Sequence, residues 1–194
     1  VGMKVEDFVD PYVGESWGSL GARILTSGNQ ISVTLGYPAA GMQAQLATEL
    51  AEFLGVDDID LQLGFSAGGG SGFGQVKHLI LVSSGKGGVG KSTTAVNLAL
   101  ALDAEGAKVG LLDADIYGPS QGMMLGVAEG RRPDIKDGKF FEPIRAHGLK
   151  AMSMSFMTTD KTPMVWRGPM ASGALQQILG QTLWGDLDYL IIDM

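Results

Sequence analysis

The residues of this chain that are best suited to chemistry lie in the octapeptide Gly-Lys-Gly-Gly-Val-Gly-Lys-Ser at positions 85–92. Its spacing fits the phosphate-binding pattern G-x-x-x-x-G-K-S/T, in which glycines let the backbone curve around an anion. We expect Lys91 to reach the β- and γ-phosphates of a nucleotide and the Ser92 hydroxyl to ligate Mg²⁺. The expected nucleotide-binding residues are Gly85, Lys86, Gly87, Gly88, Val89, Gly90, Lys91, Ser92 and Thr93.

Three aspartates come at the ends of apolar runs: Asp113 and Asp115 follow residues 108–112, and Asp193 ends the run 187–193. Ligands of open α/β sheets bind outside the carboxyl ends of the strands. Asp193 is expected to hold Mg²⁺ directly or through water, and Asp115 to orient an attacking water. Asp113 either binds in the second shell of the magnesium or fixes the loop, and capping of a turn or helix is the alternative for each aspartate. The expected magnesium residues are Ser92, Asp113 and Asp193.

Alternating strand and helix patterns must position these residues. The predicted elements are strands over 78–83, 108–112, 149–153 and 187–193, helices over 91–105 and 170–183, and a hairpin over 134–143. Short apolar runs separated by helical patterns indicate a parallel sheet. We therefore predict an α/β nucleotide-binding domain over residues 76–194.

A glycine-rich linker at 66–75 separates this domain from residues 1–65. The order there is a helix over 5–13, strands over 20–26 and 31–35, a helix over 42–54 that ends at Gly55, and a strand over 59–65. This order predicts a small α+β domain. It carries two basic and nine acidic residues within positions 1–75, whereas residues 76–194 are neutral overall.

Composition excludes several classes of protein. The 194 residues contain no cysteine, so they hold neither a disulfide nor a thiolate metal site. No apolar run approaches the roughly 20 residues of a membrane span, and no signal pattern opens the chain. Neither a basic patch for nucleic acid nor a membrane anchor is visible, and we expect a cytoplasmic protein.

Lys86, directly after the first glycine, indicates which class of phosphate-loop protein this chain resembles. The string resembles the deviant Walker A motif of the superfamily that includes MinD, ParA, the nitrogenase iron protein and the Mrp/ApbC iron–sulfur carriers. In that superfamily the early lysine crosses a dimer interface to the partner's nucleotide. The resemblance therefore implies an ATP-dependent homodimer in which Lys86, Lys91 and Asp115 are catalytic. A solvated lysine is the alternative.

Three further strings, at residues 112–120, 165–170 and 184–194, resemble the Mrp/ApbC branch; MinD and ParA proteins lack the first two. The resemblance implies a P-loop ATPase with slow basal hydrolysis that carries iron–sulfur clusters to apoproteins or from an assembly scaffold. It makes Asp115 the switch I aspartate and Asp193 the start of switch II. Residues 1–65 are similar to the MIP18/DUF59-type domain that precedes many such ATPases.

The family continues past the position of Met194 into a Cys-x-x-Cys pair that holds a 4Fe-4S cluster. This chain contains no iron–sulfur ligand, and we expect its natural sequence to continue. The expected fold agrees, because a parallel sheet that ends on the strand of Asp193 would leave that edge uncovered.

Two other functions remain open. A positioning ATPase of the MinD/ParA class would require an amphipathic tail or a basic surface. A nucleotide-dependent dimeric scaffold without significant turnover would require neither, and an assay of turnover distinguishes it from the ATPase.

Overall fold

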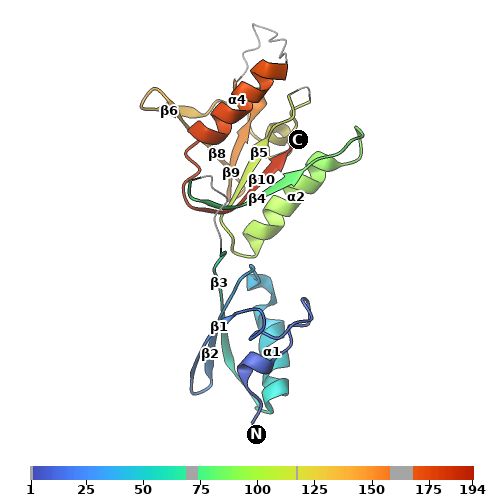
Figure 1. Cartoon of the computed structure of the whole chain (residues 1–194), viewed down its shortest axis with the longest axis vertical. Helices are drawn as coiled ribbons and strands as arrows, with labels where there is room; N and C mark the ends of the chain where they lie inside the picture. Colours follow the sequence, from blue (N-terminus) through green and yellow to red (C-terminus); the bar gives the residue numbers. More distant parts are fainter. Residues whose placement is uncertain (1, 69–73, 117, 158–167) are drawn as a thin grey trace. The chain divides into compact units, whose positions relative to one another are not determined.

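A computed structural model of the chain describes residues 2–68, 74–116, 118–157 and 168–194. The chain divides into two compact units (Figure 1). The first comprises Val1–Gly68 with Ala104–Ala107, and the second comprises Gly69–Asp103 with Lys108–Met194.

The first unit is a three-stranded sheet covered by one helix. Strand β1 (Arg23–Ser27) pairs antiparallel with β2 (Gln30–Leu35), which pairs parallel with β3 (Asp60–Phe65). Helix α1 (Gln43–Leu54) follows the short 3-10 turn η2 (Ala40–Met42). The crossover through α1 is what allows β2 and β3 to run parallel.

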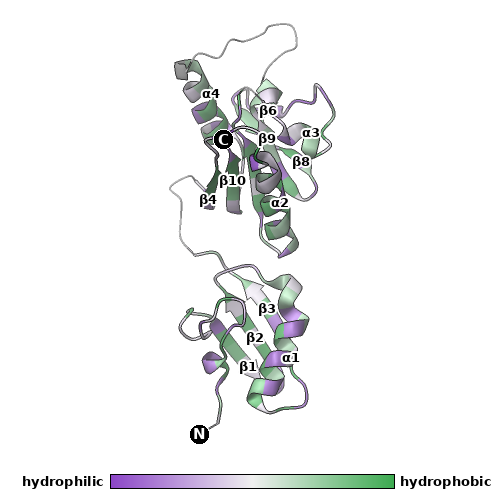
Figure 2. Ribbon diagram, turned by 90° about the vertical axis from the view of Figure 1, so that its right-hand side faces the viewer, coloured by the Kyte–Doolittle hydropathy of each residue, from purple (hydrophilic) through white to green (hydrophobic). Residues whose placement is uncertain are grey.

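An apolar stripe along α1 forms the core of this unit. Leu46 and Leu50 are buried with Val33, Leu35 and Trp17. Figure 2 shows the other face of α1 as hydrophilic. The helix ends at Gly55, as its sequence predicts, because the residue takes a left-handed conformation (φ 70°) that favours glycine.

The helix predicted over residues 5–13 is wrong. Only the 3-10 turn η1 (Val5–Asp7) forms, and a turn follows at Pro11. The carboxylate of Asp10 accepts the backbone N–H groups of Tyr12 (2.9 Å) and Val13 (3.2 Å). These bonds and the restriction that Pro11 places on the preceding residue favour a turn over a helix.

The second unit contains a five-stranded sheet in the order β4-β10-β5-β9-β8. The strands β4 (Val76–Val82), β10 (Leu187–Asp193), β5 (Val109–Asp113) and β9 (Leu149–Ser153) are parallel, and β8 (Ile144–Ala146) is antiparallel to β9. The predicted α/β class with a parallel sheet is confirmed.

The expectation that the strand of Asp193 lies at an edge is wrong. β10 pairs with β4 on one side and with β5 on the other. Six of its seven residues are buried, which suits an inner strand with both faces covered. The edges of the described sheet are β4 and β8.

Helices α2 (Lys91–Ala104) and α4 (Gly168–Gln181) lie on opposite faces of this sheet (Figures 1 and 2). Ile178 of α4 is buried in a cluster with Leu112 of β5 and Leu190 of β10. The two layers of helix fix the sheet between them and leave the carboxyl ends of its strands for the site.

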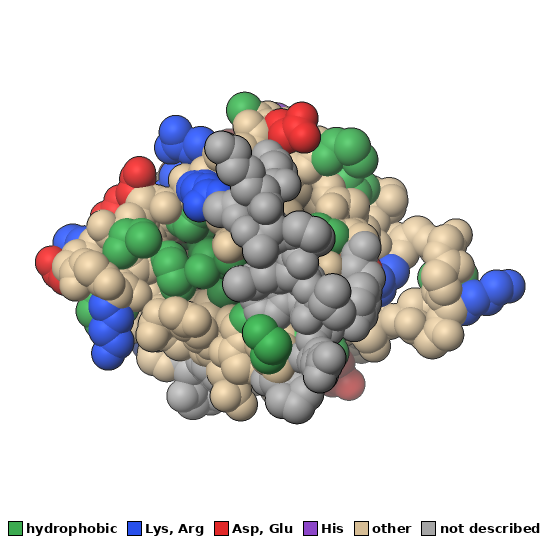
Figure 3. Space-filling model, turned by 90° about the horizontal axis from the view of Figure 1, so that it is seen from above, with side chains coloured by type: hydrophobic (Ala, Val, Ile, Leu, Met, Phe, Trp, Pro, Cys, Tyr) green, Lys and Arg blue, Asp and Glu red, His purple; other side chains and the backbone are tan. Residues whose placement is uncertain are grey.

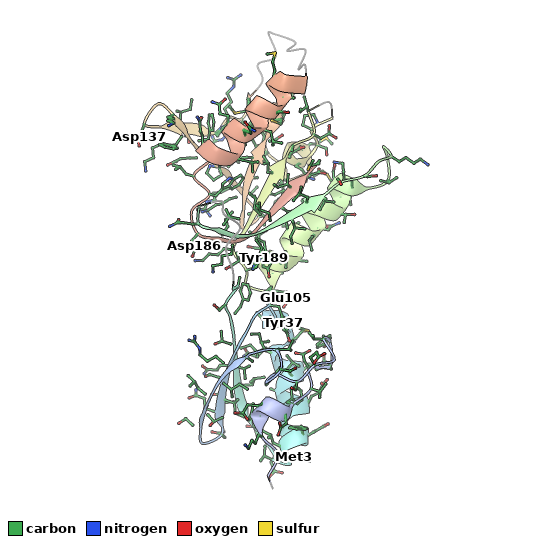
Figure 4. All side chains as sticks on the ribbon, in the orientation of Figure 1. Met3, Tyr37, Glu105, Asp137, Asp186 and Tyr189 are labelled. Carbon is green, nitrogen blue, oxygen red and sulfur yellow. The ribbon has the colours of Figure 1, made fainter. Side chains whose placement is uncertain are left out.

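Two tight turns shape the rest of the second unit. β6 (Asp134–Lys136) and β7 (Phe140–Glu142) form the predicted hairpin, and Asp137 at its tip (Figure 4) has a φ of 53°. Such a value at an Asp-Gly pair is typical of a type I′ turn. His147-Gly148 makes the same kind of turn between β8 and β9. The remaining short elements are α3 (Gln121–Met124) and η3 (Met154–Met157).

Candidate functional site

The loop between β4 and α2 is exposed at residues 83–90. It projects from the second unit with a basic side chain near its tip (Figure 3). Gly88 and Gly90 have φ values of 74° and 85°, a conformation that L side chains rarely adopt. The Ser84 hydroxyl accepts the N–H of Lys86 at 3.1 Å and donates to its carbonyl at 2.8 Å, which turns the loop back on itself.

Lys91, the first residue of α2, is the centre of the site. Its ammonium group forms an ion pair with the carboxylate of Asp193. The same Nζ lies 3.4 Å from Ser92 Oγ and 3.9 Å from Asp115 Oδ2. The structure thus brings together four of the predicted site residues.

Parallel pairing places Asp193 at this position. In register, Asp193 is opposite Val82 of β4 and Asp113 of β5, so the strands end at one edge. Asp193 is fully buried. Burial raises the pKa of its carboxyl, but hydrogen bonds from Lys91, Gln121 and Ser92 outweigh burial and hold that pKa below its ordinary value. Asp193 is therefore an anion within a buried site.

Asp113 is also fully buried, but its oxygens face the backbone. It accepts the N–H groups of Asp115 (3.2 Å), Ser120 (2.8 Å) and Gln121 (2.9 Å). Burial raises the pKa of its carboxyl, and these bonds offset part of the rise. The contacts favour the loop-fixing role, and binding of magnesium by Asp113 stays a prediction.

Asp115 is the most accessible of the three aspartates. Its side chain is 33% exposed, and its Oδ1 accepts the N–H of Gly118 at 3.0 Å. The other oxygen is the one that lies near Lys91. A group in this position can be reached by water from outside while it remains beside the phosphate loop.

No sequence pattern points to Gln121, the first residue of α3. Its side-chain Nε2 donates to the Ser92 carbonyl and to Asp193 Oδ2, both at 2.8 Å. Gln121 is almost fully buried. No motif in the chain includes this position, and only folding places it beside Asp113 and Asp193.

The oxygens around Lys91 suit a small, hard cation. Ser92 Oγ and Asp193 Oδ1 both contact the ammonium group, so they already converge on one positive charge. Among the described residues, no group of three His, Cys, Asp or Glu side chains could hold a metal by itself. Mg²⁺ at phosphates commonly takes one or two protein oxygens together with water and phosphate. The donor set therefore fits Mg²⁺ that arrives with a nucleotide.

Carboxylates at the opposite ends of the strands have structural partners. Asp188 pairs with Lys77 at 2.8 Å and accepts the N–H of Lys108, also at 2.8 Å. Asp186, labelled in Figure 4 near Tyr189, pairs with Lys108 at 3.0 Å. These ion pairs tie the start of β10 to its neighbours and do not contribute to the site.

One of the three strings that carry the family resemblance is only partly described by the structure. The residues Val165-Trp-Arg, which begin one of the three family strings, lie outside the described part of the chain.

None of the helices in the described residues combines the length and the apolar character needed to cross a bilayer.

Comparison with known proteins gives a family match over the second unit. Residues 75–194 match the family described as ParA, NUBPL iron-transfer P-loop NTPase. The matched range contains the phosphate loop and the three aspartates, so the match covers the whole of the described site.

Curated relatives carry a common name. An iron-sulfur cluster carrier protein of Pseudomonas fragi is 69% identical over 123 residues, which cover 63% of this chain and 43% of that protein. One of Deinococcus radiodurans is 43% identical over 195 residues, covering 95% of this chain and 55% of the relative. The chain spans about half the length of these relatives.

A solved structure shares the fold. A nucleotide-binding protein from Archaeoglobus fulgidus, in complex with ADP and with cobalt found in it, superposes with a TM-score of 0.52. It is 38% identical, and the alignment covers 62% of this chain and 45% of that one.

Proposed function

Because this chain belongs to the family of NUBPL-type iron-transfer P-loop NTPases, we propose that its protein is a Mrp/ApbC-type ATPase that carries iron–sulfur clusters to apoproteins. The observation that supports this most is the convergence of Lys91, Ser92 and Asp193 beside a loop of the phosphate-binding pattern. The names of the relatives are the reason for proposing an iron–sulfur cluster as the cargo.

Nucleotide binding begins with Lys91. A buried carboxylate is costly without a cation, and Lys91 now supplies that charge to Asp193. With phosphates in the loop, Lys91 would turn to them, and Asp193 and Ser92 would be free to hold Mg²⁺. Bound Mg²⁺ would neutralise charge on the phosphates. This exchange predicts that phosphate and magnesium bind together.

Hydrolysis requires a second copy of the chain. Lys86 is exposed on the projecting loop, which suits a lysine that reaches the nucleotide of a partner in a homodimer. Asp115, which is 33% exposed and lies beside Lys91, orients the attacking water. A site completed only in the dimer has slow basal turnover.

The cluster is cargo that the nucleotide cycle moves. The 194 residues contain no cysteine, so we propose that the cluster ligands lie in the half of the relatives' length that this chain does not span. Client apoproteins or an assembly scaffold, in a cytoplasmic setting, are the proposed partners.

In this proposal the first unit is an N-terminal domain of the same ATPase. We assign residues 1–65 to a MIP18/DUF59-type domain, 66–75 to a linker and 76–194 to the ATPase domain. The Deinococcus relative, which matches along 95% of the chain, supports a shared two-part organisation.

Cluster transfer from the full-length protein tests the proposal. The protein is loaded with a 4Fe-4S cluster and mixed with an apo-enzyme whose activity reports the cluster, with and without MgATP. We expect transfer whose rate changes with MgATP in the wild type and not in Lys91→Ala. Failure to hold or transfer a cluster, together with binding to anionic vesicles or DNA, would instead support a positioning ATPase.

A further inference from the structure

We propose that Gln121 is a positioning residue that holds the Asp193 carboxylate in the orientation needed for magnesium. The proposal rests on the proposed nucleotide site and adds a residue that no motif identifies. Gln121 joins three elements: it starts α3, and its side chain contacts both the first turn of α2 and the end of β10.

The two oxygens of Asp193 have different partners. Oδ1 accepts from Lys91, and Oδ2 accepts from the amide of Gln121 at 2.8 Å. When Lys91 turns to the phosphates, the Gln121 bond remains. Asp193 therefore keeps its rotamer, and Oδ1 stays directed at the place that the ammonium group has left.

The orientation of the Gln121 amide is fixed by its neighbours. Nε2 faces two acceptors, the Asp193 carboxylate and the Ser92 carbonyl, so an amide with its oxygen there would repel both. Oε1 is buried without a partner among the described residues. A buried polar atom in this state costs free energy, which indicates that the bonds of Nε2 determine the position of the side chain.

The backbone of Gln121 is held equally firmly. Its N–H donates to Asp113 Oδ2 at 2.9 Å, and Asp113 also binds the N–H of Asp115. Gln121 thus connects the loop that carries Asp115 to Asp193, the proposed magnesium ligand. Residues that orient metal ligands in this way typically contribute about 10- to 100-fold to metal affinity.

The test separates positioning from simple structural support. In the full-length protein, calorimetry measures the Kd of ATP in excess Mg²⁺ and in EDTA, for the wild type and for Gln121→Met. Methionine keeps the length of the side chain without its donors. We expect the gain in affinity on adding Mg²⁺ to fall about 10- to 100-fold, while the Kd in EDTA stays within about threefold.

Two further variants complete the design. Gln177→Met changes an exposed glutamine of α4 that bonds Gln181, and it should leave both Kd values unchanged. Gln121→Glu keeps the size but places a carboxylate against Asp193 and the Ser92 carbonyl, so it should lose the gain from Mg²⁺ more completely. Thermal unfolding confirms which variants are folded.

Equal weakening with and without Mg²⁺ in both Gln121 variants would show a merely structural role and overturn the proposal. An unchanged gain from Mg²⁺ would overturn it too. Absence of ATP binding by the wild type would contradict the proposed function itself, so the two failures are distinguishable.

Discussion

At the scale of single residues, the three aspartates near the phosphate loop differ in what their oxygens contact. Asp193 faces the charges of Lys91 and the amide of Gln121, whereas Asp113 faces backbone N–H groups. Asp115 keeps one oxygen toward Lys91 and remains partly open to solvent. Three residues of one type at similar positions are therefore suited to three tasks: binding a cation, fixing a loop and orienting water.

Another buried aspartate, Asp10, stabilises the first unit. Its carboxylate accepts from the Trp17 indole at 3.1 Å, from the Tyr37 hydroxyl and from the N–H groups of Tyr12 and Val13. In Asp10→Asn, an NH₂ group would face donors. We expect this variant to lower the free energy of unfolding by about 1–3 kcal/mol, measured in urea through the indole NMR signal of Trp17.

The same carboxyl predicts an acid dependence. Burial raises the pKa of Asp10, but the hydrogen bonds outweigh it and lower that pKa below its ordinary value of 3.8. Its contribution is complete above the pKa of the unfolded chain and is lost as the pH falls through the lower folded pKa. Asp10→Asn should remove this part of the acid destabilisation. A variant as stable and as acid-sensitive as the wild type would show that these bonds contribute nothing.

At the scale of elements, close packing between β5 and β10 requires a glycine. A Cβ on Gly110 would lie 2.7 Å from Leu187 Cδ1, 2.9 Å from Leu190 Cδ1 and 3.2 Å from Trp184 Cε3. These neighbours are buried, so they have little room to move. We expect Gly110→Ala to destabilise the second unit by about 1–3 kcal/mol, as overpacking does, in thermal or urea unfolding.

Gly173 of α4 provides the matched control. A Cβ there would meet nothing within 4 Å, and alanine is the better helix former. Gly173→Ala should therefore stabilise by up to about 1 kcal/mol. If both alanines had the same effect, the tight contact at Gly110 would not be a constraint on the sheet.

Local patterns predicted most elements but not their spatial order. The apolar run 187–193 was enough to predict a strand. The position of this strand, β10, between β4 and β5 depends on long-range pairing, which the run itself does not encode. The three-residue β8 is too short for a periodic signal, and its His147-Gly148 turn lacks the more usual Asn or Asp. Gln121 was missed because its role depends on the loop that Asp113 folds.

At the scale of the whole molecule, the proposed turnover depends on a second copy. The backbone N–H and carbonyl of Lys86 bond to the Ser84 hydroxyl, and Lys86 is exposed. In the full-length protein, Lys86→Ala should keep the Kd for MgATP within about threefold and lower turnover by at least about tenfold, since the charge acts on the partner's transition state.

Lys136→Ala, an exposed lysine of β6, is the control for loss of one surface charge. Turnover per protomer should rise with protein concentration in the wild type and in this control. Unchanged turnover in Lys86→Ala, with a confirmed dimer, would exclude a lysine acting between subunits.

The central claim is that Lys91 exchanges the Asp193 carboxylate for the phosphates of a nucleotide. Calorimetric titration of MgATP into the full-length wild type, Lys91→Ala and Lys136→Ala tests it most directly. Because Lys91→Ala removes the charged partner of the phosphates, we expect it to bind MgATP at least about a hundredfold more weakly. The Kd of Lys136→Ala should equal that of the wild type. A Kd for folded Lys91→Ala close to that of the wild type would contradict the claim.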